Sequence, residues 1–458
     1  MTTGMPWNWE TFPDYLDALE RRQGDIDFAA QLPHSPLRVY VMGERGLDPQ
    51  PPTDEDLRQM RRLTAEAIKA GALGVTTSRS SVDRFRDGRV APSVKTEHRE
   101  VLALAAGLAD AGAGVFQILP NINSPAEEQF ALLREIAEIS GRPVSFTFPQ
   151  MLTEPDGWRI TLQRLAEARA EGLTIRGQII PRPIGVLLGL ELSFHPFSLH
   201  PSFRAIEALP LSEKVRVLRE PAMRAQLLSE APSDPNPVFR SIVSEREMLF
   251  VLGDPPNYHP AIEDSIGAKA RRAGCDPMEL IYDALLQRDG EEILYRPLTN
   301  TMGERFEKAG RDLLGDANTM LSLGDGGAHY SLICDAAYTT YFLLYWSRDA
   351  AADRKIALPR AIKMMSRDPA MAIGLEDRGL IKPGMKADLN VIDLARLHLY
   401  APHVTYDLPA GGRRLAQKAD GFVATIVSGA VTYREGVSTG TLPGRLVRGA
   451  QRIDDLTR

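Results

Sequence analysis

The chain has 458 residues, of which 43% are hydrophobic and 25% are charged, a balance typical of a globular protein that buries a large core. Sixty acidic residues against 54 basic ones give a net charge of −6, which argues against nucleic acid as the main partner. Two cysteines, Cys275 and Cys334, make neither a disulfide framework nor a CxxC metal site. The first residues lack the basic and apolar regions of a signal peptide, and the most apolar run, 184–192, is too short to span a bilayer. We therefore expect a cytoplasmic protein without membrane contacts.

The first half of the chain alternates short apolar runs with helix-length amphipathic segments, which predicts parallel strands joined by crossover helices. The strand candidates are residues 38–43, 71–77, 114–119, 143–148 and 173–180. The helix candidates are residues 13–22, 54–70, 96–111, 125–140 and 156–172. Side-chain oxygens placed to cap the free amides at the starts of the last four helices belong to Thr53, Thr96, Ser124 and Asp156. The pattern is typical of an α/β fold.

The second half of the chain is less regular. Residues 181–260 are rich in proline and interrupt the alternation, so we interpret them as an elaborated loop after the fifth strand, where functional residues are often found. Further helices are expected near 261–273, 277–288, 336–349 and 357–366, and one more buried strand at 319–325. Beyond residue 382 short alternating pieces at 383–394 and 421–435 predict neighbouring strands of a small β domain with one edge or one face exposed. We therefore divide the chain into residues 1–382 and 383–458.

Residues 319–331 carry the clearest functional signal. An apolar strand ends at Asp325, two glycines follow, and His329 lies four residues on. In α/β barrels the catalytic groups stand at the carboxyl ends of strands, so Asp325 is a candidate general base that takes a proton from water and returns it to a leaving amine. The alternative is that Asp325 only caps the next helix, and the local pattern does not choose between the two.

Two segments resemble the amidohydrolase superfamily and, within it, the N-acyl-D-amino-acid deacylase (D-aminoacylase) branch. GDGGAH at 324–329 is similar to that branch's motif at strand eight. DRGLIKPGMKADLNVIDL at 377–394 resembles the passage from the barrel into the small β domain. The resemblance implies a TIM-type (β/α) barrel with a small C-terminal β domain, zinc as the cofactor, and hydrolysis of a small-molecule N-acyl-D-amino acid. It also implies that Asp325 is the proton shuttle.

Three further residues are candidate substrate contacts near the expected barrel mouth. His329 lies beside Asp325, although a structural role for it is equally open. Arg182, just beyond the fifth strand, could receive a substrate carboxylate, although an internal Arg–Asp ion pair is the commoner use of arginine. Gln178 ends that strand, and we predict that Gln117, Phe148 and Gln178 line the same mouth. His259 is interpreted as a loop residue that stabilises a proline-rich turn.

The chain departs from the family pattern at its metal ligands. Family members carry a His-x-His pair on the first barrel strand, whereas no two of the eight histidines here are spaced i, i+2. Where D-aminoacylase has two further histidines, this chain offers Gln117 or Ile118 and Phe148, and neither isoleucine nor phenylalanine binds a metal ion. We therefore assign no metal ligand, and we expect an incomplete barrel that lacks the family's N-terminal metal-binding segment and first two strands.

Our first hypothesis is an amide hydrolase acting on carbon–nitrogen bonds other than peptide bonds, and whether this chain is active alone stays open. Two alternatives are a metal-free, non-catalytic binding or assembly subunit, and a cyclic-amide hydrolase similar to hydantoinase or dihydroorotase. Unpaired strand edges attract other chains, so a homo-oligomer or a separate N-terminal polypeptide is the expected partner.

Overall fold

The computed structural model describes residues 4–81, 83–85, 88–150, 154, 156–234, 237–299, 304–322, 324 and 331–453. Two predicted site residues, Asp325 and His329, lie outside the described residues. None of the helices in the described ranges is long and apolar enough to cross a membrane.

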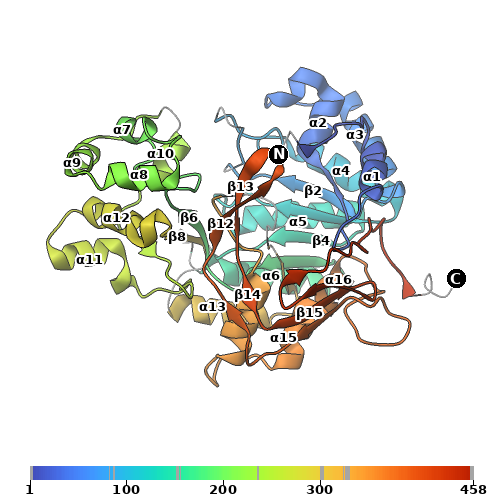
Figure 1. Cartoon of the computed structure of the whole chain (residues 1–458). Coiled ribbons are helices and arrows are strands. Elements are labelled where there is room, and N and C mark those ends of the chain that lie inside the picture. The colour runs from blue at the N-terminus through green and yellow to red at the C-terminus, as the bar shows by residue number, and fades with distance from the viewer. Residues whose placement is uncertain are drawn as a thin grey trace.

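The centre of the molecule is a six-stranded parallel sheet with strand order β1-β2-β3-β4-β5-β9 (Figure 1). Its strands are β1 (Gln31–Pro33), β2 (Gly74–Ser78), β3 (Val115–Leu119), β4 (Val144–Thr147), β5 (Ile175–Ile179) and β9 (Thr319–Leu321). The crossover helices are α3 (Asp54–Lys69), α4 (His98–Ala111), α5 (Ala126–Ser140) and α6 (Gly157–Ala170). One large apolar core joins these helices to the sheet, as expected when a parallel sheet is covered by its crossover helices. The predicted α/β fold with parallel strands is confirmed.

The prediction of a strand at 38–43 is wrong, because these residues belong to helix α2 (His34–Met42). The edge strand is β1, immediately before it. Residues 34 and 38 are one helical turn apart, so both side chains reach the same buried carboxylate, Glu100 on α4. Leu37 and Met42 are buried on the apolar side of the helix. These tertiary contacts outweigh the β propensity of the two valines in RVYVMG.

The predicted helix caps are correct at one position of four. Thr53 accepts a hydrogen bond from the backbone N–H of Asp56, and Asp56 accepts one from the backbone N–H of Thr53, which completes a capping box. The residues before α4, α5 and α6 make no side-chain cap hydrogen bond. The starts of these helices therefore follow from the apolar faces that they bury rather than from side-chain caps, whereas α4 and α5 end at the left-handed glycines Gly112 and Gly141.

Residues 181–260 are not an irregular loop, which corrects the prediction. They begin a subdomain that continues to residue 299 and has its own apolar core. An antiparallel sheet of order β6-β8-β7 supports it, formed by β6 (Ile184–Leu188), β7 (Phe250–Val251) and β8 (Leu294–Thr299). Its helices are α7 (Pro201–Arg204), α8 (Leu211–Leu218), α9 (Pro221–Ser229), α10 (Pro237–Val243), α11 (Ile266–Ala273) and α12 (Pro277–Leu285). Figure 1 shows these green and yellow helices standing to the left of the parallel sheet. Several of the prolines occupy the first turns of short helices, where proline is favoured.

Along the chain, helices come both before and after the last strand of the parallel sheet. Helix α13 (Glu304–Gly315) precedes β9, and helix α14 (Tyr338–Phe342) follows it and runs into a π-helical turn at Leu343–Arg348. Helices α15 (Leu358–Met365) and α16 (Arg367–Ala372) come next. At the other end of the chain, α1 (Phe12–Glu20) lies against α3.

The C-terminal residues form small antiparallel sheets. The largest has the order β10-β15-β16-β17, with β10 (Leu389–Ile392), β15 (Phe422–Val427), β16 (Ala430–Arg434) and β17 (Val437–Ser438). The other strands are β11 (His398–Leu399) with β14 (Ala419–Asp420), and β12 (His403–Leu408) with β13 (Gly412–Ala416). The pairing of β10 with β15 confirms that 383–394 and 421–435 hold neighbouring strands. Strand β10 is at one edge of its sheet, and Val391 in it is 48% exposed. The tail then returns to the N-terminal residues, where Gly24 pairs with Gly444 and Phe28 with Leu446.

Candidate active site

The parallel sheet has one apolar and one polar face, because successive side chains of a strand point to opposite sides. The apolar face packs into the core beneath the helices. The polar face carries residues in matching register, with Thr76 of β2 opposite Gln117 of β3 and Gln117 opposite Ser145 of β4. Two residues further along, Thr147 of β4 lies opposite Gln178 of β5. Polar residues on this face therefore cross four neighbouring strands, β2 to β5.

Hydrogen bonds connect the side chains of this row. The Nε2 of Gln117 donates to the Oε1 of Gln178 over 3.3 Å, and the Nε2 of Gln178 donates to the Oγ of Ser145 over 3.1 Å. Gln178 and Ser145 are buried, and Gln117 is half-buried. Gln117 and Gln178 thus share one face of the sheet, with Gln117 in the middle of β3 and Gln178 next to the last residue of β5. That they line the barrel mouth stays a prediction. The binding of substrate by Gln178 stays a prediction.

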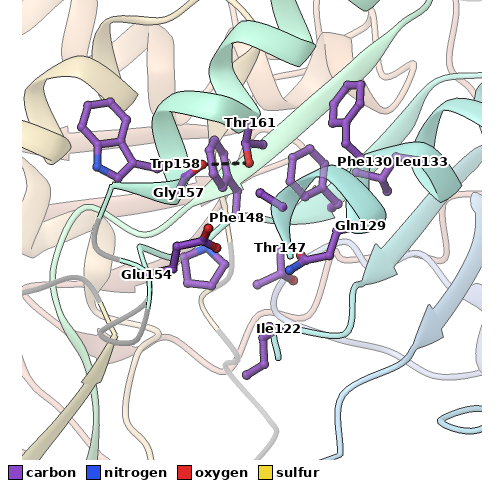
Figure 2. Close-up of a pocket in the computed structure, with 13 residues that line it drawn as sticks. Ile122, Gln129, Phe130, Leu133, Thr147, Phe148, Glu154, Gly157, Trp158 and Thr161 are labelled. Carbon is purple, nitrogen blue, oxygen red and sulfur yellow. Dashed lines mark hydrogen bonds between the residues drawn. The ribbon is translucent and has the colours of Figure 1, made fainter. Parts of the chain in front are cut away.

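Phe148 lies on the opposite face of the sheet, which corrects the prediction that it lines the same mouth. Its ring is 5.4 Å from the ring of Phe146, measured between centroids, and both rings belong to the core under the helices. Figure 2 shows Phe148 close to Gly157, Trp158 and Thr161 of α6. Phe148 also covers Gly177 of β5, where a Cβ atom would lie 2.4 Å from the Phe148 Cδ1. Phe148 therefore faces α5 and α6, because its position alternates with that of Thr147.

The described residues do not fit a zinc ion. Within these ranges no three side chains of histidine, cysteine, aspartate or glutamate come together in a way that could hold a metal. The polar face of the sheet offers the carboxamides of Gln117 and Gln178, whereas zinc sites use imidazole, thiolate or carboxylate ligands. Zinc is an expectation from the family resemblance only, and no catalytic step is assigned to it.

Arg182 lies in the turn after β5 and is buried. Its guanidinium forms an ion pair with Asp335, donates to the backbone oxygen of Cys334 over 2.8 Å, and stands 3.9 Å from the ring centroid of Tyr258. Burial alone would lower the pKa of Arg182, but the charge of Asp335 raises it above its usual range. These contacts favour the internal ion pair, the alternative to a substrate carboxylate. Asp335 was missed, because residues 182 and 335 are far apart in sequence.

His259 lies in the proline-rich turn, in agreement with its interpretation as a loop residue. Its backbone N–H donates to the Oδ1 of Asn257 over 3.0 Å. Its ring stacks on Tyr345, with 4.5 Å between centroids and 19° between planes. Tyr345 and Tyr341, which stacks on it in turn, were also missed. Their i, i+4 spacing in the predicted helix 336–349 was the available signal, since such residues share a helix face.

Comparison with known proteins now identifies the family. A family model described as the amidohydrolase family matches residues 3–433. The chain belongs to this family. It is accordingly a hydrolase acting on carbon–nitrogen bonds other than peptide bonds, as predicted.

Curated relatives agree with this assignment. The chain is 25% identical to an uncharacterized protein of Mycobacterium tuberculosis, over 93% of this chain and 71% of the relative. It is 22% identical to the D-aminoacylase of Alcaligenes xylosoxydans xylosoxydans, over 97% of this chain and 75% of that enzyme. The second similarity confirms the resemblance to the D-aminoacylase branch.

Solved structures show the same fold. The crystal structure of D-aminoacylase superposes with a TM-score of 0.57 and 19% identity, covering 96% of this chain and 75% of that one. The N-acyl-D-glutamate deacylase of Bordetella bronchiseptica, solved with zinc and a phosphonate inhibitor, gives a TM-score of 0.56 and 18% identity over the same shares. The fold is therefore that of an amidohydrolase barrel with a β domain. That the barrel here is incomplete stays a prediction.

Proposed function

We propose that this chain hydrolyses the amide bond of an N-acyl-D-amino acid and that Asp325 carries the proton between water and the leaving amine. The observation that carries the proposal is the parallel pairing of β9 with β5, which the backbone N–H of Ser322 extends by donating to the oxygen of Ile179 over 3.1 Å. Carboxyl ends of parallel strands meet at one edge of a sheet. A residue that follows β9 is thereby expected near Gln178, on the edge where the motif GDGGAH begins.

The chemistry assigned to Asp325 is general base and then general acid catalysis. Its carboxylate takes a proton from water as the water oxygen attacks the amide carbonyl carbon. The carbon–nitrogen bond then breaks, and the same proton passes to the departing nitrogen, which leaves a carboxylate and a free amino acid. A positioned group of this kind contributes about 10²–10⁴ in rate. Gln178 and His329 are the proposed substrate contacts, through a carboxamide and an imidazole.

The substrate class is tested by hydrolysis assays on the purified full-length chain. N-acetyl-D-amino acids, their L enantiomers and a cyclic amide such as hydantoin would each be incubated with the chain, with and without added Zn²⁺. We expect release of the free D-amino acid and slower turnover of the L form. Absence of turnover of every N-acyl-D-amino acid under both conditions contradicts the proposal.

A second candidate is a binding or assembly subunit that keeps the fold but not the catalysis. It is favoured by the lack of a metal-holding cluster in the described part of the chain and by the burial of Phe148. Such a subunit would bind an N-acyl amino acid in calorimetry without releasing product. Its partner would be a second copy or a separate polypeptide, which size-exclusion chromatography coupled to light scattering would detect as a mass above that of one chain.

A further inference from the structure

The parallel sheet has an open edge at β1, which pairs with β2 on one side only. The backbone oxygen of Ala30 accepts a hydrogen bond from the N–H of Leu73 over 2.8 Å, so Ala30 faces β2. Because the backbone groups of successive strand residues point to alternate sides, those of Ala29, Gln31 and Pro33 point away from β2. Pro33 suits this side, since it has no N–H to leave unpaired. Among the described residues, none pairs with the outward N–H groups of Ala29 and Gln31.

A groove of about 630 Å³ opens beside this edge, within the range of about 300–1,000 Å³ for ligand sites. Residues 29–33 line it together with an aromatic cluster near the N-terminus. The ring of Trp9 lies 5.5 Å from that of Trp7 and 5.1 Å from that of Tyr15, measured between centroids. Trp7 is 61% exposed, and Tyr40, which also lines the groove, is 49% exposed. Exposed apolar patches of this kind mark interaction sites.

The groove lies among the first helices of the chain. Its remaining walls come from α1, α2 and the middle of α3, with Phe12, Leu37 and Leu63 as apolar contributors. Figure 1 shows α1, α2 and α3, drawn in blue, together at the β2 end of the sheet. The open backbone edge and the aromatic cluster therefore face one accessible space.

An extended polypeptide segment fits both features at once. It adds a strand to the edge through backbone hydrogen bonds, while alternate side chains enter the apolar groove. The charged residues that line the groove, Glu10 and Glu66, are both acidic. Glu66 pairs with Arg62 over 3.1 Å, whereas the carboxylate of Glu10 has no ion pair among the described residues. A basic residue next to the apolar ones is therefore favoured in the segment.

A second copy of the chain is a poorer fit for the groove. Its own β1 has three residues, of which only Leu32 is large and apolar, and that side chain is already buried. Pro33 has no N–H to donate across the pair. Pairing of two β1 edges would also bring the acidic walls of the two copies toward each other.

We propose that the open edge of β1 and its aromatic groove bind an extended apolar segment of a separate polypeptide that carries a basic residue. The inference goes beyond the proposed function and does not rest on it, because no residue of this edge or groove is assigned to hydrolysis.

The test is fluorescence anisotropy of a labelled eight-residue peptide, in which valine and threonine alternate between two terminal lysines, titrated with the full-length chain. One counterpart is N-methylated at every valine and another at every threonine. The two counterparts have the same side chains and the same number of methyl groups, but only one of them loses the N–H groups that face β1. We expect that counterpart to bind at least about tenfold more weakly than the other.

Variants of the chain locate the binding. Gln31→Pro removes the outward N–H and keeps the bonds to β2, so it should weaken binding about fivefold. Gln31→Ala is the matched control, since it keeps the N–H, and it should change affinity less than twofold. Replacing the lysines of the peptide with glutamates should weaken binding about 3- to 10-fold, and by less in Glu10→Gln. Thermal unfolding of each variant verifies that it is folded.

Three results would overturn the inference. They are absence of binding of the unmodified peptide, equal affinities of the two N-methylated peptides, and unchanged affinity in folded Gln31→Pro. Light scattering adds a fourth: a dimer of the free chain that dissociates in Gln31→Pro would make a second copy, and not a separate polypeptide, the occupant. The N-methylated pair needs no substitution in the chain, so it decides the question even if Gln31→Pro fails to fold.

Discussion

The buried carboxylate of Glu100 is predicted to be the polar group on which the packing of helix α2 depends most. Its Oε1 accepts a hydrogen bond from the Nε2 of His34 over 2.7 Å, its other oxygen pairs with Arg38, and all three side chains are fully buried. Substituting Glu100→Gln keeps the size of the side chain but leaves the charge of Arg38 without its counter-ion. Removing one partner of a buried pair typically destabilises a protein by about 3–5 kcal/mol. Arg38 also donates to the carbonyl oxygen of Gly46, so we expect the lower end, about 3 kcal/mol.

Urea unfolding followed by far-ultraviolet circular dichroism measures this effect as a shift of the transition midpoint. The matched control is Glu138→Gln on α5, which breaks an exposed pair with Arg134 at 2.9 Å and should change the free energy of unfolding by less than about 0.5 kcal/mol. A Glu100→Gln variant within about 1 kcal/mol of the unmodified chain would refute the reasoning. It would mean that α2 is held by its apolar contacts alone.

Three further substitutions test the fold. Thr53→Ala removes a capping box and should lower the free energy of unfolding by about 1 kcal/mol. The control is Ser124→Ala, which precedes a helix without a side-chain cap and should lower that free energy by less than about 0.5 kcal/mol. Equal losses of stability for the two variants in chemical denaturation would contradict the prediction. Gly177→Ala places a Cβ atom against the ring of Phe148 and should cost about 1–3 kcal/mol, and an unchanged melting temperature would show that the ring can move aside. His195 is buried, and burial, followed by the charge of Lys214, lowers its pKa to about 3. As the pH falls from about 6.5 toward 3, His195 therefore takes up a proton in the unfolded chain but not in the folded one. The free energy of unfolding decreases over that range by up to about 1.4 kcal/mol per pH unit. His195→Asn keeps an acceptor for the backbone N–H of Phe197 but does not titrate, so its stability should fall less steeply with acid; an identical slope would assign the acid sensitivity elsewhere.

The strands and helices that were predicted correctly are those whose local pattern of apolar residues agrees with the way they pack in the folded chain. Five of the six parallel strands were found because each is a short apolar run between helix-length segments. The prediction of a strand at 38–43 was wrong because two valines and a tyrosine favour a strand locally. The contacts of His34 and Arg38 with Glu100, which a helix allows, join residues more than 60 positions apart in the chain. The helical subdomain after β5 was hidden by its prolines, several of which begin short helices rather than break them.

The candidate site was predicted in part. Gln117 and Gln178 were predicted to line one mouth because each ends or nearly ends a strand candidate. Successive side chains of a strand, however, point to opposite faces. The same rule makes Phe148 sensitive to register, since a shift of one residue moves a side chain to the other face. The partner of Arg182 and the ring stack beside His259 join residues distant in sequence, so only the folded chain brings them together.

The measurement that tests the central claim most directly is the kcat/KM of the Asp325→Asn variant toward an N-acetyl-D-amino acid, compared with that of the unmodified chain. We predict a loss of at least about 100-fold, because asparagine cannot accept the proton of the attacking water. Asp353→Asn, an exposed carboxylate 3.9 Å from Arg311, is the control and should retain full activity. Equal kcat/KM values for the unmodified chain and Asp325→Asn would contradict the assignment of Asp325 as the proton shuttle.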